Sequence, residues 1–146
     1  MSRKSRGFTL VEILIVVIIL GILAAIVIPQ FTNASNDARN NSVASTLQTM
    51  RGQIELFKIQ HGDSAPISAA ALTVVLTGKT NPGDLTTTAA TGTLGPYVQA
   101  FPVNPVNGWS TAAAAAAANV GWVYNVSGGT YTVQATNTTG TGLLTY

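Results

Sequence analysis

Few side chains in this sequence are able to do acid–base, nucleophilic or metal chemistry. The chain holds five acidic residues, one histidine and no cysteine. Beyond residue 61 the carboxylates are Asp63 and Asp84, with no second histidine and no phosphate-cradling glycine loop between a strand and a helix. Serines are plentiful, but no recognisable base accompanies them. Because general acid–base and nucleophilic catalysis need such groups in pairs, the sequence predicts a protein that is not an enzyme.

Glu12 is the one acidic residue in an unusual setting. It follows three cations, Arg3, Lys4 and Arg6, and opens a run, residues 13–28, that has no polar side chain. An ionised acidic side chain at the centre of a bilayer costs about 2.5–3.5 kcal/mol, and less near an end. Glu12 is therefore either a functional residue with a cationic partner or a side chain that reaches the lipid headgroups.

Residues 8–28 are apolar enough to enter a membrane, and as a helix they would span roughly 30 Å, the thickness of a bilayer core. The cations before them predict a cytoplasmic N-terminus. A secretory signal peptide usually has a shorter apolar core of about 7–15 residues, and a plain anchor needs no glutamate. Without residues 1–7, four basic side chains face five acidic ones, so no nucleic-acid-binding surface is expected.

The string "GFTLVEIL" resembles the type III signal of type IV pilins and type II secretion pseudopilins. The resemblance implies that a membrane peptidase cleaves between Gly7 and Phe8 and that the new amine of Phe8 is methylated. It extends to Glu12 and Pro29 and covers about the first thirty residues. Farther on, "QIELFKIQHG" and "GPYVQAFPVNPVNG" are more loosely similar to the major-pseudopilin branch.

This resemblance implies a structural subunit of a helical pilus-like filament, most closely a major pseudopilin of a type II secretion system. The alternative within the family is a major or minor type IV pilin for adhesion, motility or DNA uptake. A singly anchored periplasmic binding module is the alternative from another class, and it would need neither Glu12 nor a cleavable Gly7–Phe8 bond. Neither the machine nor its cargo can be read from the sequence.

The implied partners are further copies in a helical filament, minor pilins or pseudopilins, the prepilin peptidase, a membrane assembly platform and the lipid bilayer. The implied location is the bacterial inner membrane, crossed once with the N-terminus cytoplasmic and the head periplasmic. From there the subunit would enter a periplasmic or extracellular filament.

Cleavage would place a positive amine on Phe8 near the membrane depth of Glu12. The amine of one copy could then meet Glu12 of its neighbour, which would neutralise both charges and fix the axial register. Gly21 and Pro29 are costly in a helix interior, by about 1 and 3 kcal/mol. They mark a weak segment, residues 21–29, that either kinks at Pro29 or, as the resemblance implies, loosens when subunits leave lipid.

A single-sided apolar stripe follows the polar residues 30–42, with spacings of three and four that indicate a helix. The stripe consists of Val43, Leu47, Met50, Ile54 and Phe57. A polar or cationic His61 in the last turn and Gly62 just beyond are typical of a helix end. We therefore expect one helix from about Phe8 to His61, whose first half is transmembrane and whose second half is amphipathic.

The C-terminal half predicts a small antiparallel sheet that covers this stripe. Two alternating segments flank Ser127–Thr130, where Gly128-Gly129 favours a tight hairpin. The apolar face of the sheet consists of Val120, Trp122, Tyr124, Val126, Tyr131, Val133 and Ala135. "LLTY" at the end could add a strand, "FPVNPVNG" predicts an ordered loop, and Ala112–Ala118 predicts a loop or a single helical turn.

These elements predict an α+β pilin fold, in which the long N-terminal helix packs on the small sheet. The expected organisation is a cleaved leader at 1–7, a transmembrane and polymerisation helix at 8–29, and a globular head at 30–146.

Calcium is the one cofactor that the resemblance raises, because major pseudopilins commonly hold a calcium ion in their C-terminal loops through carboxylates and carbonyls. Residues 85–146 of this chain contain no Asp or Glu. Calcium prefers six to eight oxygen ligands that usually include charged ones. We therefore predict no cofactor and no metal ligand, although carbonyls of the Asn104–Gly108 loop are available.

Overall fold

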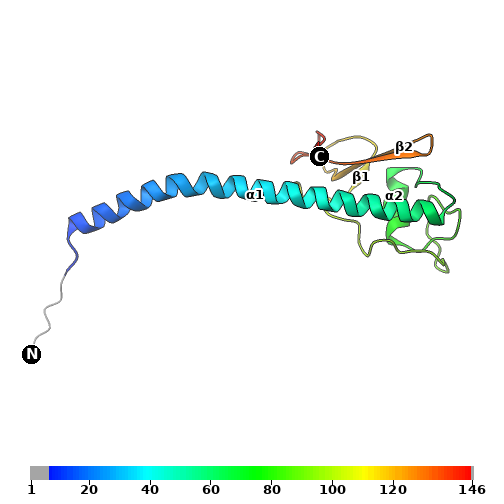
Figure 1. The fold of residues 1–146 in the computed structure, drawn as a ribbon, viewed down its shortest axis with the longest axis horizontal. Coiled ribbons are helices and arrows are strands. Elements are labelled where there is room, and N and C mark those ends of the chain that lie inside the picture. Colours follow the sequence, from blue (N-terminus) through cyan, green and yellow to red (C-terminus); the bar gives the residue numbers. More distant parts are fainter. Residues whose placement is uncertain (1–6, 146) are drawn as a thin grey trace, which may run out of the picture. The chain divides into compact units, whose positions relative to one another are not determined.

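The computed structural model describes residues 7–145, so the cations of the leader and Tyr146 lie outside the described residues. Two helices and three strands follow one another along the chain (Figure 1). They are α1 (Leu10–Gln60), α2 (Ala69–Thr77), β1 (Ala112–Ala113), β2 (Trp122–Ser127) and β3 (Thr130–Ala135). The predicted α+β class is confirmed: a long, N-terminally apolar helix is followed by a small sheet that packs on its second half.

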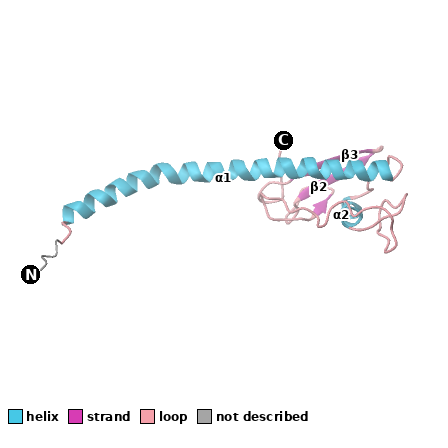
Figure 2. Ribbon diagram, turned by 60° about the horizontal axis from the view of Figure 1, so that its bottom comes forward, coloured by secondary structure: helices cyan, strands magenta, loops and turns pink. Residues whose placement is uncertain are grey.

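The chain divides into two compact units, Met1–Ala38 and Arg39–Tyr146, and α1 contributes residues to both. We describe each unit by itself. In the second unit, the C-terminal part of α1 lies beside β2 and β3, and α2 packs nearby (Figure 2). This second unit is called the head below.

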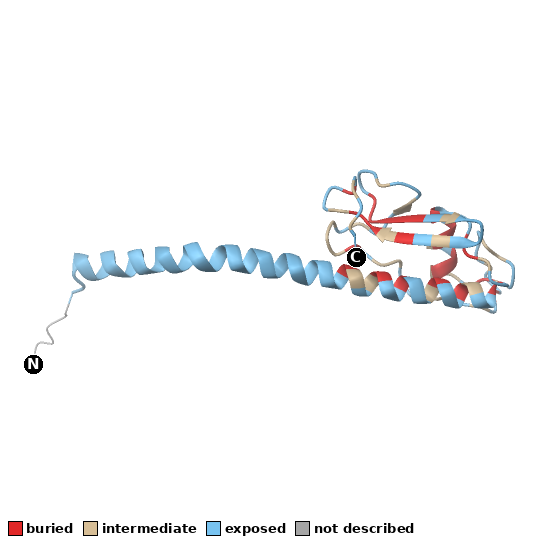
Figure 3. Ribbon diagram, turned by 45° about the horizontal axis from the view of Figure 1, so that its top comes forward, coloured by how far each residue is buried: buried red, intermediate tan, exposed pale blue. Residues whose placement is uncertain are grey.

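In the first unit, every described residue is exposed, as Figure 3 shows in pale blue. Within the part of the chain that the structure describes, α1 alone is long and apolar enough to cross a membrane. Since an apolar surface of this size is rarely left in water, it needs lipid or other protein chains around it.

The head is built on the apolar stripe of α1. All five residues of the stripe are buried, and Ile54 and Phe57 have no exposed surface. The core also takes side chains from α2 and from the sheet, namely Ala69, Leu72, Val75, Leu76, Trp122, Tyr124, Val133 and Ala135. Tyr131 and Val126 are only half-buried and pack at the edge of this core.

Helix α1 ends where the sequence indicates, through a left-handed cap. Gly62 has a φ of 67°, and the Asp63 amide donates to the Lys58 carbonyl oxygen at 2.8 Å, as in a Schellman motif. His61, expected as a polar or cationic end residue, is instead buried. Its ring stacks on Phe57 with centroids 3.8 Å apart, and Nδ1 lies 2.8 Å from the Phe57 carbonyl oxygen.

Helix α2 was not predicted from the sequence. The side chain of Ser68 caps it by accepting a hydrogen bond from the Ala71 amide at 3.1 Å. Ser, Thr, Asp and Asn are the usual caps because their oxygens satisfy amides of the first turn. Its apolar residues join the core of the head. The core is therefore formed by α1, α2 and the sheet, whereas only α1 and the sheet were expected.

The sheet has the order β1-β2-β3, with β2 and β3 joined as the predicted hairpin. Ser127 pairs with Thr130 across Gly128 and Gly129, whose φ values of 56° and 79° are those of a type I′ turn.

The prediction for Ala112–Ala118 was wrong at its start. Ala112 and Ala113 form β1, which pairs in parallel with Trp122 and Val123. Alanine alone favours helix, but here the pairing partner decides the backbone. At the end of the chain no full strand forms among the described residues, where Leu143 makes an isolated bridge to Thr136.

Candidate processing and assembly site

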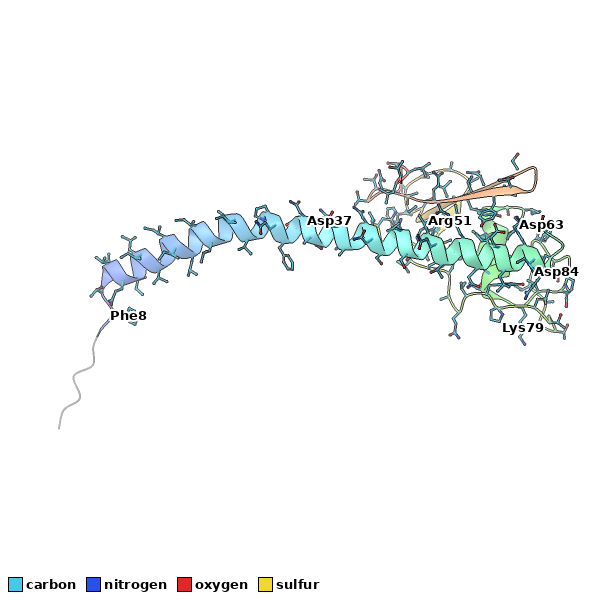
Figure 4. All side chains as sticks on the ribbon, in the orientation of Figure 1. Phe8, Asp37, Arg51, Asp63, Lys79 and Asp84 are labelled. Carbon is cyan, nitrogen blue, oxygen red and sulfur yellow. The ribbon has the colours of Figure 1, made fainter. Side chains whose placement is uncertain are left out.

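The segment before α1 contains the predicted cleavage site, and both of its residues are accessible. Phe8 is 80% exposed (Figure 4), and α1 begins two residues later. A Cβ built at Gly7 would meet no atom within 4 Å, and its backbone does not require glycine. Packing among the described residues therefore gives no reason for a glycine at position 7, and its role in cleavage stays a prediction.

Glu12 lies in the first turn of α1 and closes a capping box with Thr9. The Glu12 carboxylate accepts hydrogen bonds from the Thr9 amide at 2.8 Å and from the Thr9 hydroxyl at 2.7 Å. In return, the Glu12 amide donates to the Thr9 hydroxyl oxygen at 3.2 Å. This is the T-x-x-E pattern, in which each side chain satisfies an amide of the other residue at the helix N-terminus.

The capping box is a role for Glu12 that was not predicted from the sequence, although the spacing of Thr9 and Glu12 indicates it. It gives the carboxylate local donors but no positive charge. A glutamine at N3 of a capping box makes the same bond to the cap amide. The cap therefore explains a hydrogen-bonding residue at position 12 but does not require a charged one.

Gly21 and Pro29 both lie inside α1, which is continuous through them. A Cβ at Gly21 would meet nothing within 4 Å, so no close contact within the described chain requires a glycine at this position. Pro29 has no amide for the Ala25 carbonyl, and the Thr32 hydroxyl donates to the neighbouring Ile28 carbonyl at 3.1 Å. The predicted loosening of residues 21–29 stays a prediction.

Charged side chains of the head stabilise its own structure. Lys58 is mostly buried and lies 3.6 Å from Glu55 and 3.4 Å from Asp63. Arg51 donates to the Val133 carbonyl oxygen at 3.3 Å, and the Tyr131 hydroxyl donates to the Arg51 carbonyl oxygen at 3.3 Å. These contacts tie α1 to β3, and Figure 4 labels Arg51 on the helix beside the sheet.

No arrangement for catalysis is present among the described residues. In residues 7–145 no three His, Cys, Asp or Glu side chains gather closely enough to hold a metal ion. Between α1 and β3 there is an open groove of about 480 Å³, lined by the helix-to-sheet contacts just described. Of the charged side chains that line the groove, Lys58 pairs with Glu55 and Arg51 donates to a backbone carbonyl oxygen.

Comparison with known proteins supports the N-terminal site. Residues 2–28 match the model of the prokaryotic N-terminal methylation motif. Over 61 residues the chain is 34% identical to type II secretion system core protein G of Dickeya chrysanthemi, which covers 42% of this chain and 40% of that protein. A similar protein of the same name from Klebsiella michiganensis is 28% identical over 109 residues, 74% of this chain and 73% of that one.

A pilus protein is similar as well. The type IV narrow pilus major component PilA5 of Thermus thermophilus is 35% identical over 57 residues, 39% of this chain and 49% of that one. No solved structure matches the chain. The matched part of the chain spans about 40% of the length of the first curated relatives.

The methylation motif covers the exposed Gly7–Phe8 bond and Glu12, and the similarity to secretion proteins extends over 74% of this chain in two relatives. The chain thus carries the prokaryotic N-terminal methylation motif and is similar to type II secretion system core protein G of several bacteria and to a type IV pilus major component.

Proposed function

We propose that this protein is a structural, non-enzymatic subunit of a helical pilus-like filament. It is made as a membrane-inserted precursor, cleaved between Gly7 and Phe8, and methylated on the Phe8 amine. The observation that carries the proposal is the methylation motif on a helix whose surface is apolar and uncovered up to Phe31. Lipid covers that surface before assembly, and neighbouring copies cover it afterwards.

The machine that fits best is a type II secretion system, with this chain as its major pseudopilin. Support comes from the name shared by relatives in several bacteria and from two alignments that each cover 74% of this chain. A type IV pilus is the second candidate, favoured by the similarity to a pilus major component. A singly anchored binding module would explain the apolar helix but not the methylation motif.

The partners in this proposal are further copies, minor pilins or pseudopilins, the prepilin peptidase and a membrane assembly platform. The precursor crosses the bacterial inner membrane once, with the N-terminus in the cytoplasm and the head in the periplasm. This orientation follows from the three cations that precede the apolar segment.

Within the filament, the Phe8 amine of one copy meets Glu12 of its neighbour. A charged pair in an apolar surrounding penalises every register that leaves one charge alone, so it selects one axial spacing. The capping box is compatible with this role, because its donors leave the carboxylate charge uncompensated. Gly21 and Pro29 serve the same step by letting residues 21–29 adapt when neighbours replace lipid.

The test is intact-mass measurement of the protein after coexpression with a prepilin peptidase, followed by electron microscopy of the sheared cell surface or of periplasmic extracts. We expect a mass equal to residues 8–146 plus one methyl group, in material that forms filaments. An intact Met1, or cleavage near Ala34 by a signal peptidase, in cells that make filaments would overturn the proposal.

A further inference from the structure

The loops that close the C-terminal end of the head converge on two asparagine side chains. Asn104 is completely buried. Its Nδ2 donates to the carbonyl oxygens of Gly121 and Thr136, both at 2.9 Å, and its Oδ1 accepts from the Val106 amide at 2.9 Å. One side chain thus joins the loop before β1, the loop before β2 and the end of β3.

Asn107 does the same three residues later, with a denser set of oxygens around its nitrogen. Nδ2 lies 3.2 Å from the Val120 carbonyl oxygen, 2.8 Å from the Thr136 hydroxyl oxygen and 2.9 Å from the Asn137 carbonyl oxygen. Its Oδ1 accepts from the Trp109 amide at 3.0 Å. Three oxygens that carry partial negative charge therefore face one amide nitrogen, which carries two hydrogens.

Oxygens from several loops that point at one centre are also how proteins hold calcium. Here the residues do not fit that ion. Calcium sites usually include carboxylates, and residues 85–146 supply none. The centre of the oxygen cluster is filled by Nδ2 of Asn107, so carbonyls that would ligate a cation are used as hydrogen-bond acceptors.

The surrounding loops leave little room for rearrangement. At Gly140, where φ is 78°, an added Cβ would lie 2.5 Å from the Ala117 carbonyl oxygen and 2.7 Å from the Trp109 ring. The Thr136 hydroxyl, which accepts from Asn107, itself donates to the Val120 carbonyl oxygen. Each oxygen of the cluster is therefore held from more than one side.

We propose that the Asn107 amide takes the place of a loop-organising cation in this head, with Asn104 as its buried support. The C-terminal loops then keep their structure without calcium, at any calcium concentration. The proposal does not rest on filament assembly, because it concerns the fold of a single chain.

The test uses the full chain in detergent micelles and follows thermal unfolding by tryptophan fluorescence, in a chelator and in millimolar calcium. The wild-type melting temperature should be the same in both. Asn107→Ala should melt several degrees lower in both conditions, because the Val120, Thr136 and Asn137 oxygens lose the hydrogen bonds from Asn107. Asn125→Asp, at an exposed position of β2, is the control for adding a carboxylate.

Asn107→Asp is the decisive variant. It places a carboxylate among three oxygens, so it should melt below the wild type in chelator, and calcium should restore much of the loss. A wild-type melting temperature that falls in chelator or rises with calcium overturns the proposal. So does an Asn107→Ala protein that melts with the wild type, or an Asn107→Asp protein that calcium does not affect while the control behaves as the wild type.

Discussion

At the scale of single residues, Glu12 has one observed role and one proposed role, and its position in the sequence cannot separate them. The capping box with Thr9 is local and needs a hydrogen-bonding side chain. The proposed pair with a neighbouring amine is intermolecular and needs a negative charge. Since a glutamine keeps the first property and lacks the second, the two roles can be separated by experiment.

Gly7 is the second single residue for which the proposed function makes a prediction. We expect Gly7→Ala to be cleaved poorly and bulkier residues to be cleaved still less, because a peptidase that reads a small side chain before the cut has no room for a larger one. Mass spectrometry of membrane fractions measures the cleaved share. An added Cβ at Gly7 meets no described atom within 4 Å, so a clash within the described structure does not explain a loss of cleavage.

The matched control for Gly7 is Gly52→Ala, since a Cβ at Gly52 also meets nothing within 4 Å. Gly52 lies inside α1 and far from the motif in sequence, so this variant should be cleaved like the wild type. Normal cleavage of a Gly7 variant with a bulky side chain would show that the peptidase does not read this position.

Three tyrosine side chains with a raised pKa determine how the stability of the fold depends on alkaline pH. Burial is the main cause that raises the pKa of Tyr97 and Tyr124 above 10.0 and that of Tyr131 to about 12. A raised pKa in the folded state means that the neutral phenol stabilises the fold. That stability is complete below pH 10 and is lost as pH rises through about 12.

Thermal unfolding of the full chain in detergent, measured across this range, should show a melting temperature that falls steadily above pH 10.0. Tyr131→Phe should flatten part of that fall, because it removes one of the groups whose ionisation favours unfolding. A melting temperature that is constant over the same range in the wild type would show that these tyrosines have no raised pKa in the folded state.

At the scale of elements, α1 unites two surfaces of different character. Its apolar stripe in the head packs on the sheet, whereas its first half is exposed in the part of the chain that the structure describes. Phe57 is the clearest probe of the stripe, because its ring is fully buried and stacks on His61. Phe57→Ala should cost about 3–5 kcal/mol of folding free energy, as expected for a buried aromatic side chain.

Denaturant unfolding of the full chain in detergent measures this loss. Leu56→Ala is the matched control, since Leu56 is the adjacent residue of α1 and is 42% exposed. It should lose much less stability. If both variants unfold at the same denaturant concentration as the wild type, the stripe does not hold the head together.

Elements with a strong local pattern could be predicted from the sequence. The helix stripe and the hairpin both follow from side-chain spacing plus a turn that only glycine adopts easily, at Gly128-Gly129. Helix α2 was missed because it has only nine residues, and four of them are Thr or Val, which also suit a strand. β1 was missed because alanine carries no strand signal, and its pairing with Trp122 is set by the fold.

The candidate site shows the same division. The cleavage bond and Glu12 could be found because the motif is continuous in sequence, and the capping box was within reach of the same short stretch. The asparagine network could not be found in this way, because the partners of Asn104 are 17 and 32 residues away and lie in different loops. Only the folded loops bring those carbonyl oxygens together.

At the scale of the whole molecule, the two units differ in structure: one has a core of its own and the other is exposed. The head has its own core, its own helix cap and its own network of asparagine hydrogen bonds. It can therefore stay folded while the first unit changes its surroundings. Among the described residues, the apolar surface of the first unit is exposed, as the proposed exchange of lipid for neighbouring copies requires. The proposed filament uses this difference, because only the uncovered helix has to change surroundings during assembly.

The central claim is that assembly needs the charge of Glu12. Glu12→Gln should be synthesised, inserted and cleaved like the wild type, since a neutral side chain enters lipid more easily and keeps the capping box. Losing one partner of a buried charge pair costs about 3–5 kcal/mol, which lowers an association constant by roughly two to four orders of magnitude. Glu12→Ala, which loses both cap and charge, should fail in assembly to a similar degree.

The direct measurement is the share of Glu12→Gln subunits in filaments purified from cells that express the variant and the wild type together, compared by quantitative mass spectrometry with their share among cleaved subunits in the membrane. The account predicts that the variant is abundant in the membrane and strongly depleted in the filament. Equal shares in both would contradict it, and would leave Glu12 as a helix cap whose charge has no part in assembly.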